Sequence, residues 1–326
     1  MRKRILTMRK GILVCCLFAG LSAHAQTDTS ITSMMNSMDP KKDEKVPAKI
    51  FYGQKVINAN TTEMLHKGHM EFKVLHNFGD IAGHDGGSHN YWGLDNAADI
   101  KISFQVALSD KFNVVLARTR GGQKTGGDVR ELYELGLKYQ FLQQIEHDPG
   151  HPISLSIYAN VVTSVMKNLN LVNAENSFHS FSDRGSSFYQ AIIAKKIGKV
   201  SLQLNPSFVH TNYVQKGDQN NMFAIGGAVR LPIYKRFSLI ADYFHHFRTR
   251  ESIEALRQIN VETYDVFGIG VEILTPGHVF HLNVTNTTYL LENRFIPRTF
   301  STYGKGQYRF GFTIARDFVV FRSKKK

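Results

Sequence analysis

Residues 99–108 read DIKISFQVAL, and every second side chain in this stretch is large and apolar or nearly so. The apolar positions are Ile100, Ile102, Phe104, Val106 and Leu108, and the polar ones between them are Lys101, Ser103 and Gln105. Successive side chains of a β-strand point to opposite faces of the sheet. The alternation therefore predicts a strand with one apolar and one polar face.

The same alternation recurs from about residue 68 to the end of the chain. We predict twelve strands, over residues 70–74, 99–108, 112–119, 133–141, 153–160, 188–196, 200–205, 223–231, 237–247, 266–273, 280–284 and 308–316. A tilted strand of about 9–11 residues spans the hydrocarbon layer of a membrane. Most of these segments approach that length, so the pattern favours strands that cross a membrane.

The connections between the predicted strands alternate between short and long. Short turns are expected at 109–110, 143–151, 197–199, 232–236 and 275–278. Long polar loops are expected at 79–98, 120–130, 164–186, 211–220, 248–261 and 286–305. This order is typical of outer-membrane barrels, which have short periplasmic turns and long external loops. Helical spacing of apolar residues within 250–259 predicts a short helix in one external loop.

We therefore predict an all-β fold, a transmembrane up-and-down antiparallel β-barrel of about 12 strands. The alternative is a soluble secreted β-sandwich, whose strands also alternate. A sandwich does not require its loops to be short at one end and long at the other. A closed barrel also pairs every backbone polar group within lipid.

The N-terminus has the pattern of a secretory signal peptide over residues 1–25. A basic head precedes an apolar run from Ile12 to Leu21, and cleavage is expected after Ala25. The alternatives are a single membrane anchor, for which the run is short, and a lipoprotein modified at Cys15 or Cys16, which lacks the required flanking pattern. Sec export would bring the chain to the cell outer membrane of a Gram-negative bacterium.

Composition narrows the possible functions further. The chain has 326 residues, 42% of them hydrophobic, and a net charge of +13, which alone would suggest a nucleic-acid partner. The signal peptide carries five of the basic residues and no acidic one, so its removal lowers the net charge to +8. Both cysteines leave with it, which excludes disulfides, thiolate metal sites and a cysteine nucleophile. We expect no nucleic-acid partner, and the aromatic and apolar content excludes wholesale disorder.

Three regions are expected: a signal peptide over 1–25, a flexible periplasmic leader over 26–66, and the barrel over 67–326. The leader is rich in Thr, Ser, Met, Lys and Asp and shows no sustained period. Within it, residues 51–57 are expected to form an ordered piece under the mouth of the barrel.

Three stretches carry a resemblance to a known family. They are FGD at 78–80, YWGLDNA at 91–97, and YRFGFTIAR at 308–316. In these the chain resembles a domain-of-unknown-function family of Gram-negative outer-membrane β-barrels, over roughly residue 50 to the end. The resemblance implies an outer-membrane barrel and supplies no catalytic residues. The last strand is also similar to the aromatic-rich strand that the barrel-assembly machinery recognises during biogenesis, although the chain continues past Phe321.

Strand parity directs ten charged side chains into the lumen. They are Glu71, Lys73, Lys101, Glu134, Lys138, Arg230, Asp242, Glu262, Glu272 and Arg309. Five are basic and five are acidic, whereas a strongly selective ion pore shows one dominant sign. This lumen is therefore either a narrow, weakly selective passage or one that ion pairs cross and seal.

Two small clusters suggest chemistry only weakly. His84, Asp85 and His89 lie in a glycine-rich loop and could approach a divalent cation, but their spacing matches no established ligand pattern. An interfacial lipid hydrolase would need a serine beside a histidine, and His179 with Ser180 or Ser182 is the nearest candidate. We predict no catalytic residue, no resident metal and no cofactor.

These observations favour a non-enzymatic barrel that passes or binds a small polar solute. The alternative is a sealed barrel that anchors a periplasmic partner through its leader. Outer-membrane lipid and, during biogenesis, the assembly machinery are the other expected partners.

Overall fold

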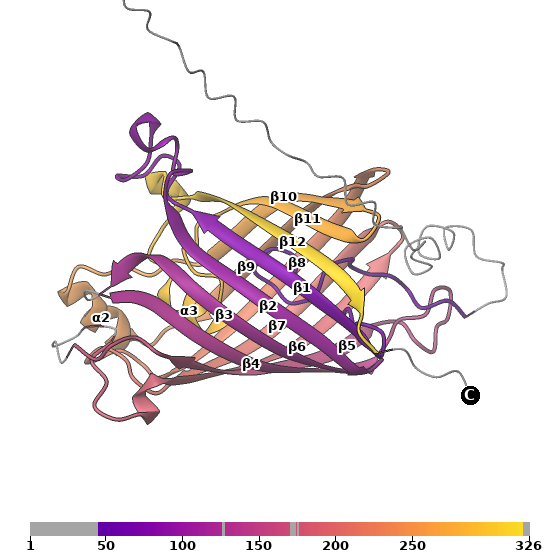
Figure 1. Ribbon diagram of the computed structural model, residues 1–326, viewed down its shortest axis with the longest axis horizontal. Coiled ribbons are helices and arrows are strands. Elements are labelled where there is room, and N and C mark those ends of the chain that lie inside the picture. The colour runs from indigo at the N-terminus through magenta and orange to yellow at the C-terminus, as the bar shows by residue number, and fades with distance from the viewer. Residues whose placement is uncertain (1–44, 126–127, 170–173, 175, 322–326) are drawn as a thin grey trace, which may run out of the picture. The chain divides into compact units, whose positions relative to one another are not determined.

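The computed structural model describes residues 45–125, 128–169, 174 and 176–321, and within them twelve antiparallel strands close into a barrel (Figure 1). The strands are β1 (His69–Phe78), β2 (Ala97–Ser109), β3 (Phe112–Thr125), β4 (Asp128–Leu142), β5 (Ser154–Ser164), β6 (Gly185–Ile197), β7 (Val200–Thr211), β8 (Asn221–Tyr234), β9 (Phe237–Phe247), β10 (Val266–Thr275), β11 (His278–Thr285) and β12 (Arg309–Val319). Each strand pairs with its neighbours in the chain, and β1 pairs with β12 to close the barrel. The predicted up-and-down barrel is confirmed.

Short turns gather at one end of the barrel and long loops at the other, as predicted. One expected loop is wrong, because β3 continues to Thr125 and β4 already begins at Asp128. Arg120 and Glu131 lie opposite each other in this hairpin and form an ion pair of 3.4 Å. Opposite charges directly across an antiparallel pair stabilise the ladder, so polar sequence here extends the strands instead of ending them.

Two α-helices lie in the long loops of the described residues. The predicted helix within 250–259 is confirmed as α2 (Arg250–Gln258), and Thr249 caps it by accepting a hydrogen bond from the backbone N–H of Ser252. The other helix, α3 (Glu292–Arg298), lies between β11 and β12 and was not predicted. No helix in the described part of the chain is long and apolar enough to cross a membrane.

The outer face of the barrel is apolar. Large apolar side chains that alternate with buried ones remain about half exposed on successive strands, for example Leu116, Leu135, Val161, Leu204 and Leu282. In water such a continuous surface would be unfavourable, but it is the face that a membrane barrel presents to lipid. The alternation seen in the sequence is therefore set by lipid outside and a polar interior inside.

The predicted leader needs a correction. The signal peptide over 1–25 and residues 26–44 lie outside the described residues. Residues 50–63, assigned to a flexible leader, instead enter the barrel and are almost completely buried. The piece expected at 51–57 is ordered, but it lies inside the lumen and not under its mouth. The segment has no regular period because its irregular backbone packs against an enclosing wall and not against one face of a sheet.

The lipid-facing assignment predicts the effect of charge on the outer face. Leu137 lies midway between the outward aromatic residues Tyr133 and Phe141 of β4, and its side chain is 46% exposed. We expect Leu137→Arg to lower the unfolding free energy by about 2–4 kcal/mol in vesicles, since the charge meets hydrocarbon. Leu94→Arg, in an exposed loop, should change it by less than about 0.5 kcal/mol. Equal effects in denaturant titrations would contradict the assignment.

Candidate functional site

The candidate site is the lumen, and the chain itself fills it. After residues 45–49, which bond to the β4–β5 turn through Ala48 N–H and Gln144 C=O at 2.8 Å, the chain turns into the barrel. Residues 50–63 form what we call the lumenal hairpin. Its turn is closed by a 2.8 Å hydrogen bond from Val56 N–H to Ala59 C=O, and Lys55 pairs with Asn60. The chain then leaves by the same end to begin β1.

The tip of the hairpin is held by one carboxylate of the wall. Asp242 on β9 accepts hydrogen bonds from the backbone N–H groups of Ile57, Asn58 and Ala59 at 3.0, 2.6 and 2.9 Å. The side-chain amide of Asn58 adds a fourth at 3.0 Å. Gly268 makes this approach possible, because a Cβ there would lie 3.0–3.1 Å from Asp242, Asn58 and Ile57. Hydrogen bonds to an ionised group are worth about 1.5–3 kcal/mol each, so this is a strong latch.

Wall side chains also satisfy the carbonyl groups of the hairpin backbone. The donors are Lys138 to Glu63 C=O (2.5 Å), Gln140 to Thr62 C=O (3.0 Å), Ser201 to Ile50 C=O (2.5 Å), and Gln203 and Asn205 to Asn60 C=O (2.7 and 3.1 Å). An irregular backbone buried away from water needs such partners. The polar wall is thus matched to the segment that occupies it.

A second segment closes the lumen from the long-loop end. The chain between β11 and β12 folds inward, and α3 contacts β6, β7, β8 and β9. Glu292 of α3 forms a 2.6 Å ion pair with Lys55 of the lumenal hairpin and accepts a 3.1 Å hydrogen bond from Asn60. Both charged side chains are at most 5% exposed. The two filling segments therefore meet inside the barrel through a buried ion pair.

Further buried ion pairs line the wall on either side of this contact. Lys101 on β2 reaches Glu134 on β4 at 2.5 Å, and Glu134 also accepts hydrogen bonds from Tyr158 and Asn160. Arg130 pairs with Asp99 at 3.4 Å. Asp99 also accepts a 3.0 Å hydrogen bond from Leu290 N–H, which ties the inward loop to β2.

Near the short-turn end, Arg230 joins the wall to the hairpin. Its guanidinium pairs with Glu272 at 2.6 Å and lies 4.5 Å from the ring centre of Tyr52. His281 approaches the other oxygen of Glu272 at 3.4 Å. The ion pair with Glu272 fixes Arg230 on the wall, and the cation–π contact with Tyr52 holds this part of the hairpin.

The rest of the interior is apolar and forms one continuous core with the filling segments. Ile50, Phe51, Val56 and Ile57 of the hairpin belong to it. Its wall members on β6 to β10 are Phe188, Ile192, Ala194, Val209, Met222, Ala224, Ala228, Ile240, Phe244 and Val266. Phe295 of α3 packs on Phe244 with ring centres 5.4 Å apart. Most of the apolar side chains of the lumen therefore lie on β6 to β10, where they alternate with polar partners of the hairpin such as Gln203 and Asp242.

Little empty space remains between the hairpin and the polar wall. A cavity of about 20 Å³ lies beside Lys55, Lys73, Lys101 and Lys138. A water molecule needs about 10–15 Å³ of such volume, so this cavity has room for one and is too small for a larger solute.

The structure places nine of the ten predicted lumenal charges in the interior: Glu71, Lys73, Lys101, Glu134, Lys138, Arg230, Asp242, Glu272 and Arg309 are all buried. Lys73 pairs with its neighbour Glu71 at 2.8 Å, and Arg309 pairs with Asp80.

Glu262 is the exception. It lies in the loop before β10, is 60% exposed, and pairs with Lys305 of the last long loop. Hydrogen bonds from Tyr264 and Lys305 lower the pKa of the Glu262 carboxyl. Its assignment to the lumen is wrong because β10 begins only at Val266, so strand parity does not apply to it.

The two weak chemical clusters are both in exposed loops. His84 and Asp85 contact each other at 3.0 Å, while His89 is exposed in the same loop. Within the described residues, no three His, Cys, Asp or Glu side chains are arranged to hold a metal ion.

The hydrolase candidate lies before β6. Ser180 and Ser182 hydrogen-bond to each other at 2.7 Å, while the ring of His179 packs edge-on against Tyr213. Asp183 accepts the backbone N–H groups of Ser180 and His179, which lowers the pKa of its carboxyl. Asp183 therefore orders the turn and does not orient an imidazole.

Five charged residues of the site were missed: Lys55, Glu63, Asp99, Arg130 and Glu292. Asp99 has the inward parity of Lys101 and could have been found from it. Arg130 was assigned to a loop, and the other three lie in segments without a period. No local pattern marks such residues.

A family model described as "Membrane bound beta barrel domain (DUF5777)" matches residues 51–318. The chain belongs to this family. The match begins at Phe51 and so includes most of the lumenal hairpin as well as the wall of the membrane-bound barrel.

No curated protein matches the chain. Among solved structures it is similar to the KdgM porin, at 7% identity and TM-score 0.44, over 77% of this chain and 99% of that one. It is similar to an outer membrane channel from Pseudomonas putida F1 at 10% identity and TM-score 0.48, over 79% of this chain and 98% of that one. It is also similar to outer membrane phospholipase A from Escherichia coli at 10% identity and TM-score 0.40, over 90% of this chain and 98% of that one. Channels and an enzyme both occur among them, so these similarities do not separate the two classes.

The latch predicts how Asp242 controls the hairpin. We expect Asp242→Ala to leave three buried N–H groups without an acceptor, at a cost of about 1–3 kcal/mol for each. Amide hydrogen exchange at 57–59 should then rise by at least about tenfold. Asp242→Asn keeps one acceptor oxygen and should give a smaller rise. Asp317→Asn removes a carboxylate charge that contacts His69 at 2.9 Å outside the latch, and it should leave exchange at 57–59 unchanged.

The buried ion pair predicts strong coupling between the two filling segments. Lys55→Met leaves Glu292 buried without its countercharge, and we expect a loss of about 3–5 kcal/mol of unfolding free energy. The double variant with Glu292→Gln should recover most of it, since Asn60 can still donate to the amide oxygen. A double-mutant cycle measures the coupling. Additive losses would show that the pair does not join the segments.

Proposed function

We propose that the protein is a non-enzymatic outer-membrane channel for a small polar solute, held closed by its lumenal hairpin. The observation that carries this proposal is the polar wall behind the hairpin. Lys73, Lys101, Lys138 and Gln140 face the interior along β1 to β4, although an interior built only for closure could be filled by apolar side chains. Withdrawal of the hairpin would expose these polar side chains from the short-turn end, and a displacement of α3 would extend the opening to the long-loop end.

The closed state strongly predominates in this proposal. The hairpin buries Ile50, Phe51, Val56 and Ile57, and a buried side chain of this size is worth about 1.5–3 kcal/mol. Spontaneous opening is therefore rare. Residues 45–49 leave the lumen at the short-turn end, where a partner acting on the preceding chain could shift the equilibrium.

A sealed barrel that anchors a periplasmic partner is the second candidate. The apolar core shared by Phe51, Phe244 and Phe295 favours it, since exposure of these rings to water opposes opening. In that case the hairpin is a permanent part of the fold, and residues before it provide the anchoring segment.

A reversible lock on the hairpin separates the two candidates. Asn58 and Asp242 are in side-chain contact, so Asn58→Cys with Asp242→Cys allows the tip to be cross-linked to β9 by oxidation. For the channel we expect small-sugar uptake into vesicles by the wild-type barrel, loss of uptake in the oxidised variant, and recovery above the wild-type rate on reduction. Recovery exceeds the wild-type rate because the latch carboxylate is gone.

The matched control is Leu202→Cys with Val229→Cys, which cross-links β7 to β8 on the outer face of the wall and removes no contact of the hairpin. Its oxidation should not change uptake. No uptake by folded wild-type protein, together with conductance after deletion of residues 50–63, would favour the sealed platform. A folded variant that lacks both residues 50–63 and the inward segment 288–299 and still shows no conductance would contradict the channel outright.

A further inference from the structure

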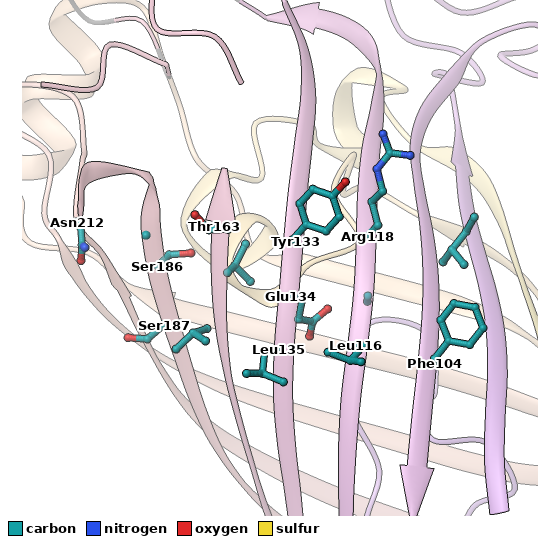
Figure 2. A pocket seen from close by; sticks show the side chains of 15 residues that line it. Phe104, Leu116, Arg118, Tyr133, Glu134, Leu135, Thr163, Ser186, Ser187 and Asn212 are labelled. Carbon is teal, nitrogen blue, oxygen red and sulfur yellow. The ribbon is translucent and has the colours of Figure 1, made fainter. Parts of the chain in front are cut away.

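A groove of about 780 Å³ lies on the outer wall across β2 to β6 (Figure 2). Its lining includes large side chains that face lipid, among them Phe104, Leu116, Leu135 and Val161, each more than 40% exposed. Sites for small molecules commonly measure about 300–1,000 Å³. The groove is therefore large enough for a specific ligand and opens on the membrane side.

Strand register arranges the lining in two rows across the wall. The lower row is Phe104, Leu116, Leu135, Val161 and Ser187, each paired with the next. The upper row, one step closer to the long loops, is Ile102, Arg118, Tyr133, Thr163 and Gly185. The lower row is mostly apolar, and the upper row carries a charge and hydroxyl groups. The groove thus crosses from the apolar belt into the polar rim.

Small side chains explain why the wall is hollowed here. Three outward positions in the groove carry small side chains: Thr163 on β5, and Gly185 and Ser187 on β6. The next outward position of β6 is Tyr189, which pairs with Phe208 on β7. A Cβ on Gly185 would lie 3.0 Å from the side chain of Asn212. The bulky residues border a depression whose floor is made by small ones.

The rim of the groove is positively charged. Arg118 and Arg120 share Glu131 at 2.9 and 3.4 Å, which leaves the three groups with a net charge of +1. The side chains of Arg118 and Arg120 are 44% and 56% exposed. Each guanidinium has five N–H donors, so the single carboxylate of Glu131 leaves donors of both arginines for a ligand. Guanidinium groups match the oxygens of a phosphate geometrically. Figure 2 shows Arg118 beside Tyr133 at the upper edge of the groove, above Leu116 and Leu135.

We propose that this groove binds one acyl lipid with an anionic phosphate headgroup, taken from the leaflet on the long-loop side. The acyl chain lies over Leu116, Leu135 and Val161, and the phosphate is bound by Arg118 and Arg120. The upper row carries the charge and the lower row is apolar, so a lipid fits in only one orientation, with its headgroup toward the long loops. This lipid site is independent of the lumen and does not depend on channel activity.

Native mass spectrometry of the full-length mature barrel, released from nanodiscs of phosphatidylglycerol and phosphatidylcholine, tests the site. We expect one phosphatidylglycerol retained by the wild type. Arg118→Gln with Arg120→Gln should reduce retention at least about tenfold, since charge-assisted hydrogen bonds are lost. Ser187→Trp should reduce it by filling the groove while leaving the rim charge intact.

The matched control is Lys235→Gln with Arg236→Gln, which removes two exposed basic residues at the short-turn end. It should retain lipid as the wild type does. Heat-modifiable migration in gels verifies that each variant is a folded barrel. Equal retention of both lipids by the wild type, or unchanged retention in folded groove variants, would overturn the proposal. Displacement of the lipid by inorganic phosphate would equally overturn it, because the acyl chain would then contribute nothing.

Discussion

The lumen of a twelve-stranded barrel is wider than its own wall side chains can fill, and this constraint governs the rest of the structure. Small barrels of eight strands close their interior with side chains alone, whereas porins leave it to water. Here two segments of the chain enter from opposite ends and meet at Lys55 and Glu292. Neither charge could be buried alone, since an unpaired ion away from water costs several kcal/mol. The hairpin can therefore be buried only when α3 supplies Glu292, and α3 only when the hairpin supplies Lys55.

Two kinds of wall side chain hold the hairpin by different forces. The apolar side chains of β6 to β10 supply surface that stabilises without directing. Polar side chains on β4, β7 and β9, for example Lys138, Gln203 and Asp242, supply donors and an acceptor at the places where the hairpin backbone has unpaired groups. Directional bonds fix the register of an irregular segment that has no ladder of its own. The combination gives the hairpin one position and one orientation in the lumen.

The wall could be predicted from the sequence because lipid imposes a period of two on every strand. The same parity placed nine charged residues inside, and it failed for Glu262 where the strand had not yet begun. The hairpin could not be predicted in this way. Its partners Lys138, Gln203, Asp242 and Glu292 come from distant parts of the chain, and each contact depends on barrel closure. Residues without a period are often exposed, and nothing local separates them from a segment that is enclosed.

The Lys101–Glu134 ion pair lies inside the barrel at the depth of the membrane, so closure of the lumen depends on how charges are accommodated there. Glu134 lies between Tyr133 and Leu135 on β4, so its pair with Lys101 is at the level where the outer rows change from polar rim to apolar belt. The wall separates these charges from hydrocarbon, while the hairpin and α3 separate them from water. If the hairpin leaves, water must enter at this depth to replace the bonds it made, because charges in a dry interior are far costlier than hydrated ones. Opening the lumen and hydrating the middle of the barrel are therefore one event, and a state with the hairpin withdrawn but the lumen dry is excluded on energetic grounds.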